Sequence, residues 1–289
     1  MLERTQVMMG TFVTISLPKT NTKELQESFE LLKEVESSLS SYDKHATIYS
    51  LNHQRKVKLT PYSFKALSLS QSYYKKSAGY FDITVGSITK DLYHFGEDEV
   101  LVENTRLQKA KVDFNGVHFT QEKAWLDEGI TVDLGGMGKG FGVDVVATYL
   151  REQNISVGVI ALSGDIRCLD LCAMCIQDPF REAGTLLHFK TRLPNTAIST
   201  SGNYRRFIKD TKTNHLINPK KRASQQGFAS VTLVSLGSNA DIDAYATAAS
   251  VMPLTKAIAF LDTLNMGYLL VTVDGTQYKS QNLAEFIRY

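Results

Sequence analysis

Two oxygen-bearing side chains, Asp243 and Thr247, stand four residues apart in the segment DAYAT. On a helix, residues at this spacing share one face, so the carboxylate and the hydroxyl lie side by side. Both groups are hard oxygen donors, and Mg²⁺ is usually held by one or two carboxylates together with substrate phosphates and waters. The pair therefore predicts a magnesium site that a phosphate-containing substrate completes. The alternative is that Asp241 or Asp243 only stabilises the N-terminus of a helix.

A glycine-rich segment, TVDLGGMGKGFGVD, connects an expected strand over 124–133 to a helical pattern that begins by Val143. Unpaired backbone N–H groups and the helix dipole favour an anion at such a junction. Glycines let the backbone approach a ligand closely, and Lys139 adds a positive charge. The spacing is neither the dinucleotide motif G-x-G-x-x-G nor a Walker loop. The segment therefore predicts a phosphate contact, with a tightly packed turn as the alternative.

Two other polar segments could complete a site. In Tyr80, Phe81 and Asp82, two aromatic rings could pack against a flat ligand while the carboxylate bonds to its edge, and a core-lining turn is the alternative. His215 follows the hydroxyl-rich turn at 200–204 and could transfer a proton, although a lone histidine is often structural. That turn lacks the G-x-S-x-G motif of a hydrolase nucleophile.

The three cysteines, Cys168, Cys172 and Cys175, have the spacing that holds the iron–sulfur cluster of radical S-adenosylmethionine enzymes. Cluster ligands must converge, whereas this segment reads as a strand in which Cys175 faces away from the other two. We therefore predict small buried thiols, no disulfide framework and a reducing compartment.

The composition is that of an ordinary globular protein, with 43% hydrophobic and 21% charged residues. A net charge of +2 gives no sign of a nucleic-acid-binding surface. No segment reaches the roughly 20 apolar residues of a membrane helix, and residues 1–10 contain no apolar signal core. These features predict a cytoplasmic protein without a membrane segment. The basic run at 220–222 is expected to be a solvated loop, with a contact to substrate phosphates or a partner protein as the alternative.

Hydrophobic periodicity predicts the elements around these motifs. A helix over 22–40 has apolar residues at helical spacing and Thr22 as its N-cap, and a second helix follows Pro61. Residues 96–110 are expected to be rich in loops. The remaining expected helices cover 240–251 and 254–264, and the expected strands cover 5–17, 111–119, 124–133, 157–163, 172–177, 185–191, 229–236 and 268–273. This irregular order favours an α+β, or mixed α/β, fold in a single domain over 1–289.

Taken in order, these segments resemble the ApbE family, the FAD:protein FMN transferases. The resemblance extends over nearly the whole chain, and the joint order of its blocks is far more specific than any one block. The matching blocks are MGTFVTISL at 9–17, LSSYD at 39–43, YFDITVG at 80–86, VDLGGMGKGFGVD at 132–144, SGDI at 163–166, ISTSGNY at 198–204, HLINP at 215–219 and DAYATAASVM at 243–252. The resemblance implies an ApbE-like domain with mixed sheets flanked by helices.

The same resemblance implies FAD as the substrate, with Mg²⁺ at its diphosphate. It implies metal ligands at Asp243, at Thr247 and at the carbonyl of Gly136, and it makes His215 the candidate general base. The flavin contacts that it implies are Met9, Tyr42, Tyr80, Phe81, Asp82, Asp133, Lys139 and Ile217.

The implied reaction transfers FMN from FAD to a Thr or Ser hydroxyl of a target flavoprotein through a phosphoester bond and releases AMP. An FAD pyrophosphatase that gives FMN and AMP, and a flavin-binding carrier without turnover, are the alternatives. The intact metal and base positions favour an enzyme over a carrier. Two segments depart from the family: Ala46 and Thr47 replace a frequent Ser-Glu pair, and Lys220 and Lys221 replace the usual Thr-Gly after Pro219. The short segment before the first block resembles that of a cytosolic member, which would act on a cytosolic flavoprotein.

Overall fold

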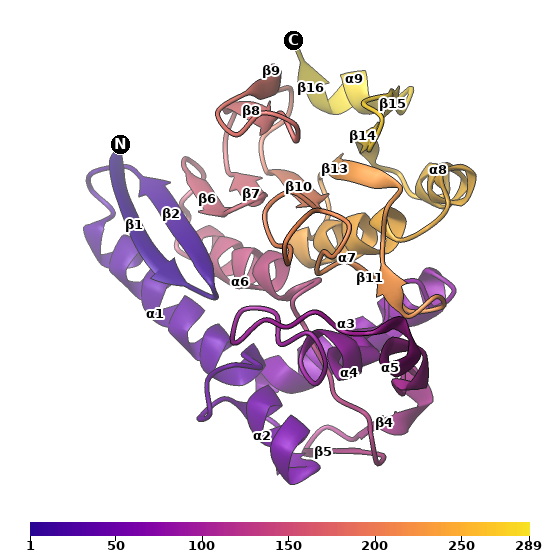
Figure 1. The fold of residues 1–289 in the computed structure, drawn as a ribbon. Helices are drawn as coiled ribbons and strands as arrows, with labels where there is room; N and C mark the ends of the chain where they lie inside the picture. Colours follow the sequence, from indigo (N-terminus) through magenta and orange to yellow (C-terminus); the bar gives the residue numbers. More distant parts are fainter.

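The computed structural model describes residues 1–289, and its centre is an eight-stranded antiparallel sheet (Figure 1). In spatial order its strands are β1 (Leu2–Met8), β2 (Thr11–Leu17), β6 (Val159–Leu162), β7 (Asp165–Cys168), β10 (Thr196–Gly202), β13 (Phe228–Ser235), β14 (Gly267–Thr272) and β15 (Gln277–Lys279). The strand predicted over 5–17 is a hairpin of β1 and β2, because Met9 and Gly10 both have positive φ angles, 51° and 69°, and reverse the chain.

Helices cover one face of this sheet (Figure 1). α6 and α7 lie across β6, β7, β10 and β13, and α1 packs on α6. The helices are α1 (Thr22–Leu39), α2 (Thr47–Gln54), α3 (Pro61–Lys76), α4 (Gly86–Thr89), α5 (Asn104–Lys109), α6 (Gly138–Glu152), α7 (Asn239–Ser250), α8 (Leu254–Asp262) and α9 (Leu283–Phe286). The predictions for α1, α3, α7 and α8 are confirmed. The predicted N-cap of α1 was wrong by one residue, because Asn21 is the cap and Thr22 is the first helical residue.

The opposite face of the sheet packs against a three-stranded sheet of β8 (Ala173–Gln177), β9 (Thr185–Thr191) and β16 (Ile287–Arg288). The predicted cysteine-bearing strand is therefore two strands, since β7 ends at Cys168 and β8 begins at Ala173. The turn between them brings Cys168 and Cys172 together in a disulfide, with 5.9 Å between their Cα atoms. Cys175 is free and exposed. The prediction of three buried thiols was wrong, because the segment turns where a strand was expected.

Helices α2 to α5 form the lower part of the molecule with a small sheet of β3 (Lys56–Lys58), β5 (Lys123–Leu126) and β4 (Val117–Phe119) (Figure 1). A two-stranded ribbon of β11 (Ile217–Asn218) and β12 (Ala223–Ser224) lies beside them. A cluster of 37 buried apolar residues joins this part to α7 and β13, which agrees with one mixed α and β domain. The lower part includes α5, which lies inside the segment predicted to be loop-rich. Every helix of the chain is too short or too polar to cross a membrane.

The glycine-rich segment differs from its predicted form. The strand expected over 124–133 ends at Leu126, and the chain then turns at Gly129, which has a φ of 75°. The next residues bond to side chains instead of a neighbouring strand: Thr131 N donates to Ser87 Oγ and Val132 N donates to Asn52 Oδ1, both at 2.9 Å. Helix α6 then begins at Gly138, five residues before the predicted start at Val143, so three of the five glycines of the segment, Gly138, Gly140 and Gly142, lie within the helix.

Candidate active site

The candidate site is built where the first turn of α6 meets α7. Gly140 N–H donates a hydrogen bond to Asp243 Oδ2 at 3.0 Å, and Lys139 Nζ lies 3.4 Å from the same oxygen. Glycine is required at position 140, because a Cβ atom there would lie 2.3 Å from the carbonyl oxygen of Asn239 at the start of α7. The glycine-rich sequence therefore serves close packing and also brings a backbone N–H and an ammonium group to the predicted metal ligand.

Strand β7 adds a second carboxylate, from Asp165. Lys139 Nζ lies 2.7 Å from Asp165 Oδ2, and Ser199 Oγ on β10 donates to Asp165 Oδ1 at 2.5 Å. The sequence contains Asp165 in the block SGDI, but no role for this residue was predicted. The signal that was available is the polar alternation of Asp165 and Arg167 in β7, which points both side chains toward the helices rather than toward the second sheet.

Burial shifts the pKa values of Asp243 and Lys139. Burial raises the pKa of Asp243 to about 7, the charge of Asp165 adds to the rise, and Lys139 and the Gly140 N–H oppose it. Burial alone would lower the pKa of Lys139, but the charges of Asp165 and Asp243 raise it above its ordinary value. Lys139 is therefore a permanent cation, whereas Asp243 lacks full compensation for the burial of its charge.

The remaining predicted metal donors lie beside Asp243. Thr247 Oγ1 donates to the carbonyl oxygen of Gly136 at 3.3 Å, and Ser201 Oγ lies 3.4 Å from Thr247 Oγ1. Asp243 Oδ1 accepts no hydrogen bond from the protein, since both of its contacts use Oδ2. One free carboxylate oxygen, two hydroxyls and a carbonyl are hard donors that suit Mg²⁺. No group of three or more His, Cys, Asp or Glu side chains is placed so that it could hold a metal ion.

His215 is partly buried near the same centre. Its Nδ1 lies 3.0 Å from the carbonyl oxygen of Arg206, which can only accept, so Nδ1 carries the proton and Nε2 is left as an acceptor. Burial lowers the pKa of His215 to about 4; the bond to Arg206 opposes this shift, and the positive charges of Arg206 and Lys139 add to it. His215 is therefore neutral at physiological pH, and Nε2 is able to accept a proton.

Asp133 and Tyr42 are connected through a lysine that was not predicted. Asp133 Oδ2 accepts a hydrogen bond from Thr89 Oγ1 at 2.7 Å and lies 3.6 Å from Lys90 Nζ, which in turn lies 3.5 Å above the ring of Tyr42. Burial raises the pKa of Asp133, but the charge of Lys90 and the hydrogen bonds from Thr89 and Gly135 N lower it more, so the net shift is downward. Asp133 is thus an ionised group whose charge is balanced by Lys90.

The three side chains of the segment Tyr80, Phe81 and Asp82 have different surroundings. Phe81 is buried against Gly136, where an added Cβ would lie 3.2 Å from its ring, and Lys220 and Lys256 each place Nζ within 5 Å of the Tyr80 ring centre, at 4.8 and 4.9 Å. Asp82 Oδ1 accepts hydrogen bonds from the backbone and hydroxyl of Thr84 and so caps a short turn. Its pKa is raised to about 6 by burial, against the two Thr84 bonds.

The two remaining predicted flavin contacts, Met9 and Ile217, pack in different parts of the structure. Met9 occupies the tip of the β1–β2 hairpin, where its sulfur is 3.2 Å from the position of a Cβ on Gly142 in α6. Ile217 is buried in a cluster with Tyr93 and Phe95. The geometry therefore pairs Lys139 with Asp243 and Thr247 with the carbonyl of Gly136, and Asp243 and Thr247 lie on the same helix, α7. The predicted flavin contacts and metal ligands stay predictions.

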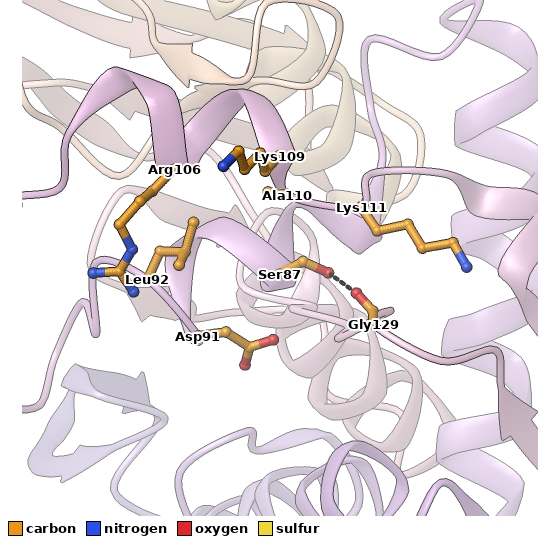
Figure 2. A pocket seen from close by; sticks show the side chains of 8 residues that line it. All are labelled: Ser87, Asp91, Leu92, Arg106, Lys109, Ala110, Lys111 and Gly129. Carbon is orange, nitrogen blue, oxygen red and sulfur yellow. Dashed lines mark hydrogen bonds between the residues drawn. The ribbon is translucent and has the colours of Figure 1, made fainter.

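An open cavity of about 340 Å³ lies beside α4 and α5 (Figure 2). Its charged groups are three cations and one carboxylate, Asp91, which accepts a hydrogen bond from Thr131 Oγ1 at 2.6 Å. Its lining residues are Ser87, Asp91, Leu92, Arg106, Lys109, Ala110, Lys111 and Gly129. None of the predicted site residues lines this cavity, so we place the candidate site at the junction of α6 and α7 instead.

Comparison with known proteins shows the family of this chain. The model of the ApbE family matches residues 9–270. The chain is 27% identical to an FAD:protein FMN transferase of Vibrio cholerae over 92% of this chain and 86% of that protein. It superimposes on the flavin transferase ApbE from Vibrio cholerae with a TM-score of 0.84 at 23% identity, and the match covers 99% of this chain and 98% of that chain. It superimposes on the ApbE protein from Thermotoga maritima with a TM-score of 0.89 at 21% identity, and that match covers 100% of this chain and 99% of the other. Because the family model matches nine-tenths of the chain, this chain belongs to the ApbE family.

Proposed function

We propose that this chain is an FAD:protein FMN transferase, which moves FMN from FAD to a Thr or Ser hydroxyl of a target flavoprotein and releases AMP. Membership of the ApbE family and the names of the curated relatives support the proposal. The observation that carries it is the contact of the α6 N-terminus with Asp243, where Gly140 N–H and Lys139 Nζ meet a carboxylate that has one unbonded oxygen. That arrangement suits a diphosphate with a divalent cation, because it offers both an anion-binding and a cation-binding side.

Mg²⁺ is the cation that we propose for this site. Asp243, Thr247 and the carbonyl of Gly136 would hold it, with Ser201 as a neighbouring hydroxyl. When bound, it would neutralise the diphosphate and polarise the phosphorus that is attacked.

The chain's own residues account for the remaining steps. The acceptor oxygen forms a bond to the phosphorus of the FMN half, and the bond from that phosphorus to the bridging oxygen breaks, so that AMP leaves with the bridging oxygen. His215 Nε2 takes the proton of the acceptor hydroxyl. Lys139 and the N–H groups at the start of α6 stabilise the charge that develops on the departing AMP.

Incubation with FAD, Mg²⁺ and an acceptor flavoprotein, followed by mass analysis of the acceptor, tests the proposal. A transferase adds one FMN to the acceptor through a phosphoester and releases one AMP. Release of FMN and AMP with no modified acceptor would instead identify an FAD pyrophosphatase, and FAD binding without either product would identify a carrier. The cytoplasmic location of the reaction stays a prediction from the sequence.

A further inference from the structure

We infer that Asp165 is a positioning residue that keeps Asp243 available to a divalent cation by holding the Lys139 ammonium to one side. The inference rests on the proposed function, because it concerns the same metal-binding carboxylate. It assigns a role to a residue that neither the sequence motifs nor the family resemblance had placed in the site.

The distances show which carboxylate Lys139 prefers. Lys139 Nζ is 2.7 Å from Asp165 Oδ2 but 3.4 Å from Asp243 Oδ2, so its closer partner is Asp165. Asp165 is 1% exposed, and its other oxygen is fixed by Ser199 Oγ at 2.5 Å. A buried, doubly held carboxylate is a rigid anchor, whereas the longer contact with Asp243 is the one that a competing cation would displace.

Asp243, unlike Asp165, has one carboxylate oxygen that accepts no hydrogen bond. Both protein contacts of its carboxylate, from Lys139 and from Gly140 N–H, use Oδ2, so Oδ1 is open. No other acidic side chain lies within ion-pair distance of Lys139. If Asp165 lost its charge, Asp243 would therefore be the remaining carboxylate for Lys139 to pair with.

The charge of Asp165 also affects how well a cation can bind at Asp243. Asp165, Lys139 and Asp243 together carry a formal charge of −1, and an uncharged residue at position 165 would reduce it to zero. The Lys139 ammonium would then compete with a divalent cation for Asp243 in a buried place, where solvent screens the competition poorly. A variant that also removes the charge of Lys139 would restore −1 and remove the competitor.

The test measures Mn²⁺ binding directly, by the electron paramagnetic resonance signal of the free ion, with saturating FAD and no acceptor. We expect Asp165→Asn to raise the Kd for Mn²⁺ at least tenfold, which corresponds to about 1.4 kcal/mol. We expect Lys139→Gln to lower the Kd, and the double variant Asp165→Asn/Lys139→Gln to lie within about threefold of the wild type. Asp178→Asn is the matched control, since Asp178 is a buried carboxylate that pairs with Arg181 beyond β8 and has no part in the site, and the Kd of this variant for Mn²⁺ should change by less than about threefold.

The outcomes separate this inference from the proposed function. An unchanged Mn²⁺ Kd in Asp165→Asn would overturn the inference, even if FMN transfer by the wild type were established. A double variant that binds Mn²⁺ as weakly as Asp165→Asn would also overturn it, because Asp165 would then act on the cation itself and not through Lys139. If the wild type bound no Mn²⁺, the metal proposal and this inference would fail together.

A second variant guards against misfolding of Asp165→Asn, which circular dichroism would reveal. Ser199→Ala removes the hydrogen bond to Asp165 Oδ1 and leaves every charge in place. We expect it to weaken Mn²⁺ binding by about threefold, and combination with Lys139→Gln should abolish that effect. A loss that persists without the lysine would again contradict the positioning role.

Discussion

Replacement of Gly140 by alanine should damage the site through packing alone. An added Cβ would lie 2.3 Å from the carbonyl oxygen of Asn239, whereas about 3.0 Å is the shortest distance that such atoms tolerate, so α6 and α7 must move apart by about 0.7 Å. Overpacking of this kind costs about 1–3 kcal/mol, against a gain of about 1 kcal/mol for alanine over glycine in a helix. We therefore expect a net loss of up to about 2 kcal/mol, seen as a fall in Tm of up to about 8 °C.

The same movement breaks the alignment of Gly140 N–H with Asp243, and displacements of about 1 Å near the reacting groups can cost about 100-fold in rate. Thermal unfolding and turnover of saturating FAD with acceptor would measure the two effects. Gly138→Ala is the matched stability control, because it lies in the same helical turn and its Cβ would meet no atom within 4 Å. A Gly140→Ala protein as stable as Gly138→Ala would refute the packing argument.

The remaining expectations concern the base, the metal ligand and the disulfide. His215→Asn should lower kcat by about 10²–10⁴-fold with FAD affinity nearly unchanged, and a normal kcat at saturating FAD and acceptor would remove His215 from the chemistry. Burial lowers the pKa of His215 from 6.5 to about 4, so between these pH values the unfolded chain binds more protons than the folded one. The contribution of His215 to stability is therefore present above about pH 6.5 and is lost as pH falls to about 4. Urea unfolding across that range should show it as a steeper dependence of the free energy of unfolding on pH in the wild type than in His215→Asn. Asp243→Ala should abolish FAD turnover while the circular dichroism spectrum is retained, and EDTA should stop the wild-type reaction until Mg²⁺ is restored; full activity of the variant at low Mg²⁺ would contradict the ligand assignment. Serine at Cys168 and Cys172 should leave FAD turnover intact and lower the Tm, and loss of turnover in a folded variant would contradict the view that the disulfide only joins β7 to β8.

The helical part of the site could be predicted because helical spacing is a local property. Asp243 and Thr247 lie on one face of α7, as the four-residue interval requires, and the glycine-rich sequence indicated that α6 begins beside a ligand or a close neighbour. The predicted start of α6 was nevertheless five residues late. Glycine has a low helix propensity, so the pattern at 138–142 did not read as helical, and tertiary packing of Gly140 on Asn239 decided the outcome.

The ion pairs of the site could not be predicted, because they depend on which strands and helices become neighbours. The packing of α6 on β7 brings Lys139 to Asp165. The turn that follows β5 brings Asp133 to Lys90, which directly follows α4. The strands β7 and β10 were also missed: β7 has only four residues, and the inward-facing residues Asp165 of β7 and Ser199 of β10 are polar, so the usual apolar alternation was broken. Polar residues facing the core conflict with the pattern of a buried strand, and such conflicts are expected at functional sites.

The disulfide also depends on which elements become neighbours. The spacing of Cys168 and Cys172 allows two side chains to point the same way along a strand, where their Cα atoms would be far too distant to bond. Only the turn between β7 and β8 brings these atoms to 5.9 Å. Cys168 is fully buried beneath the second sheet, at the end of the strand whose first residue is Asp165. The disulfide therefore fixes the far end of β7, while Ser199 and Lys139 fix the end that faces Asp243, so that the position of Asp165 is set by the strand as a whole and not by its local sequence.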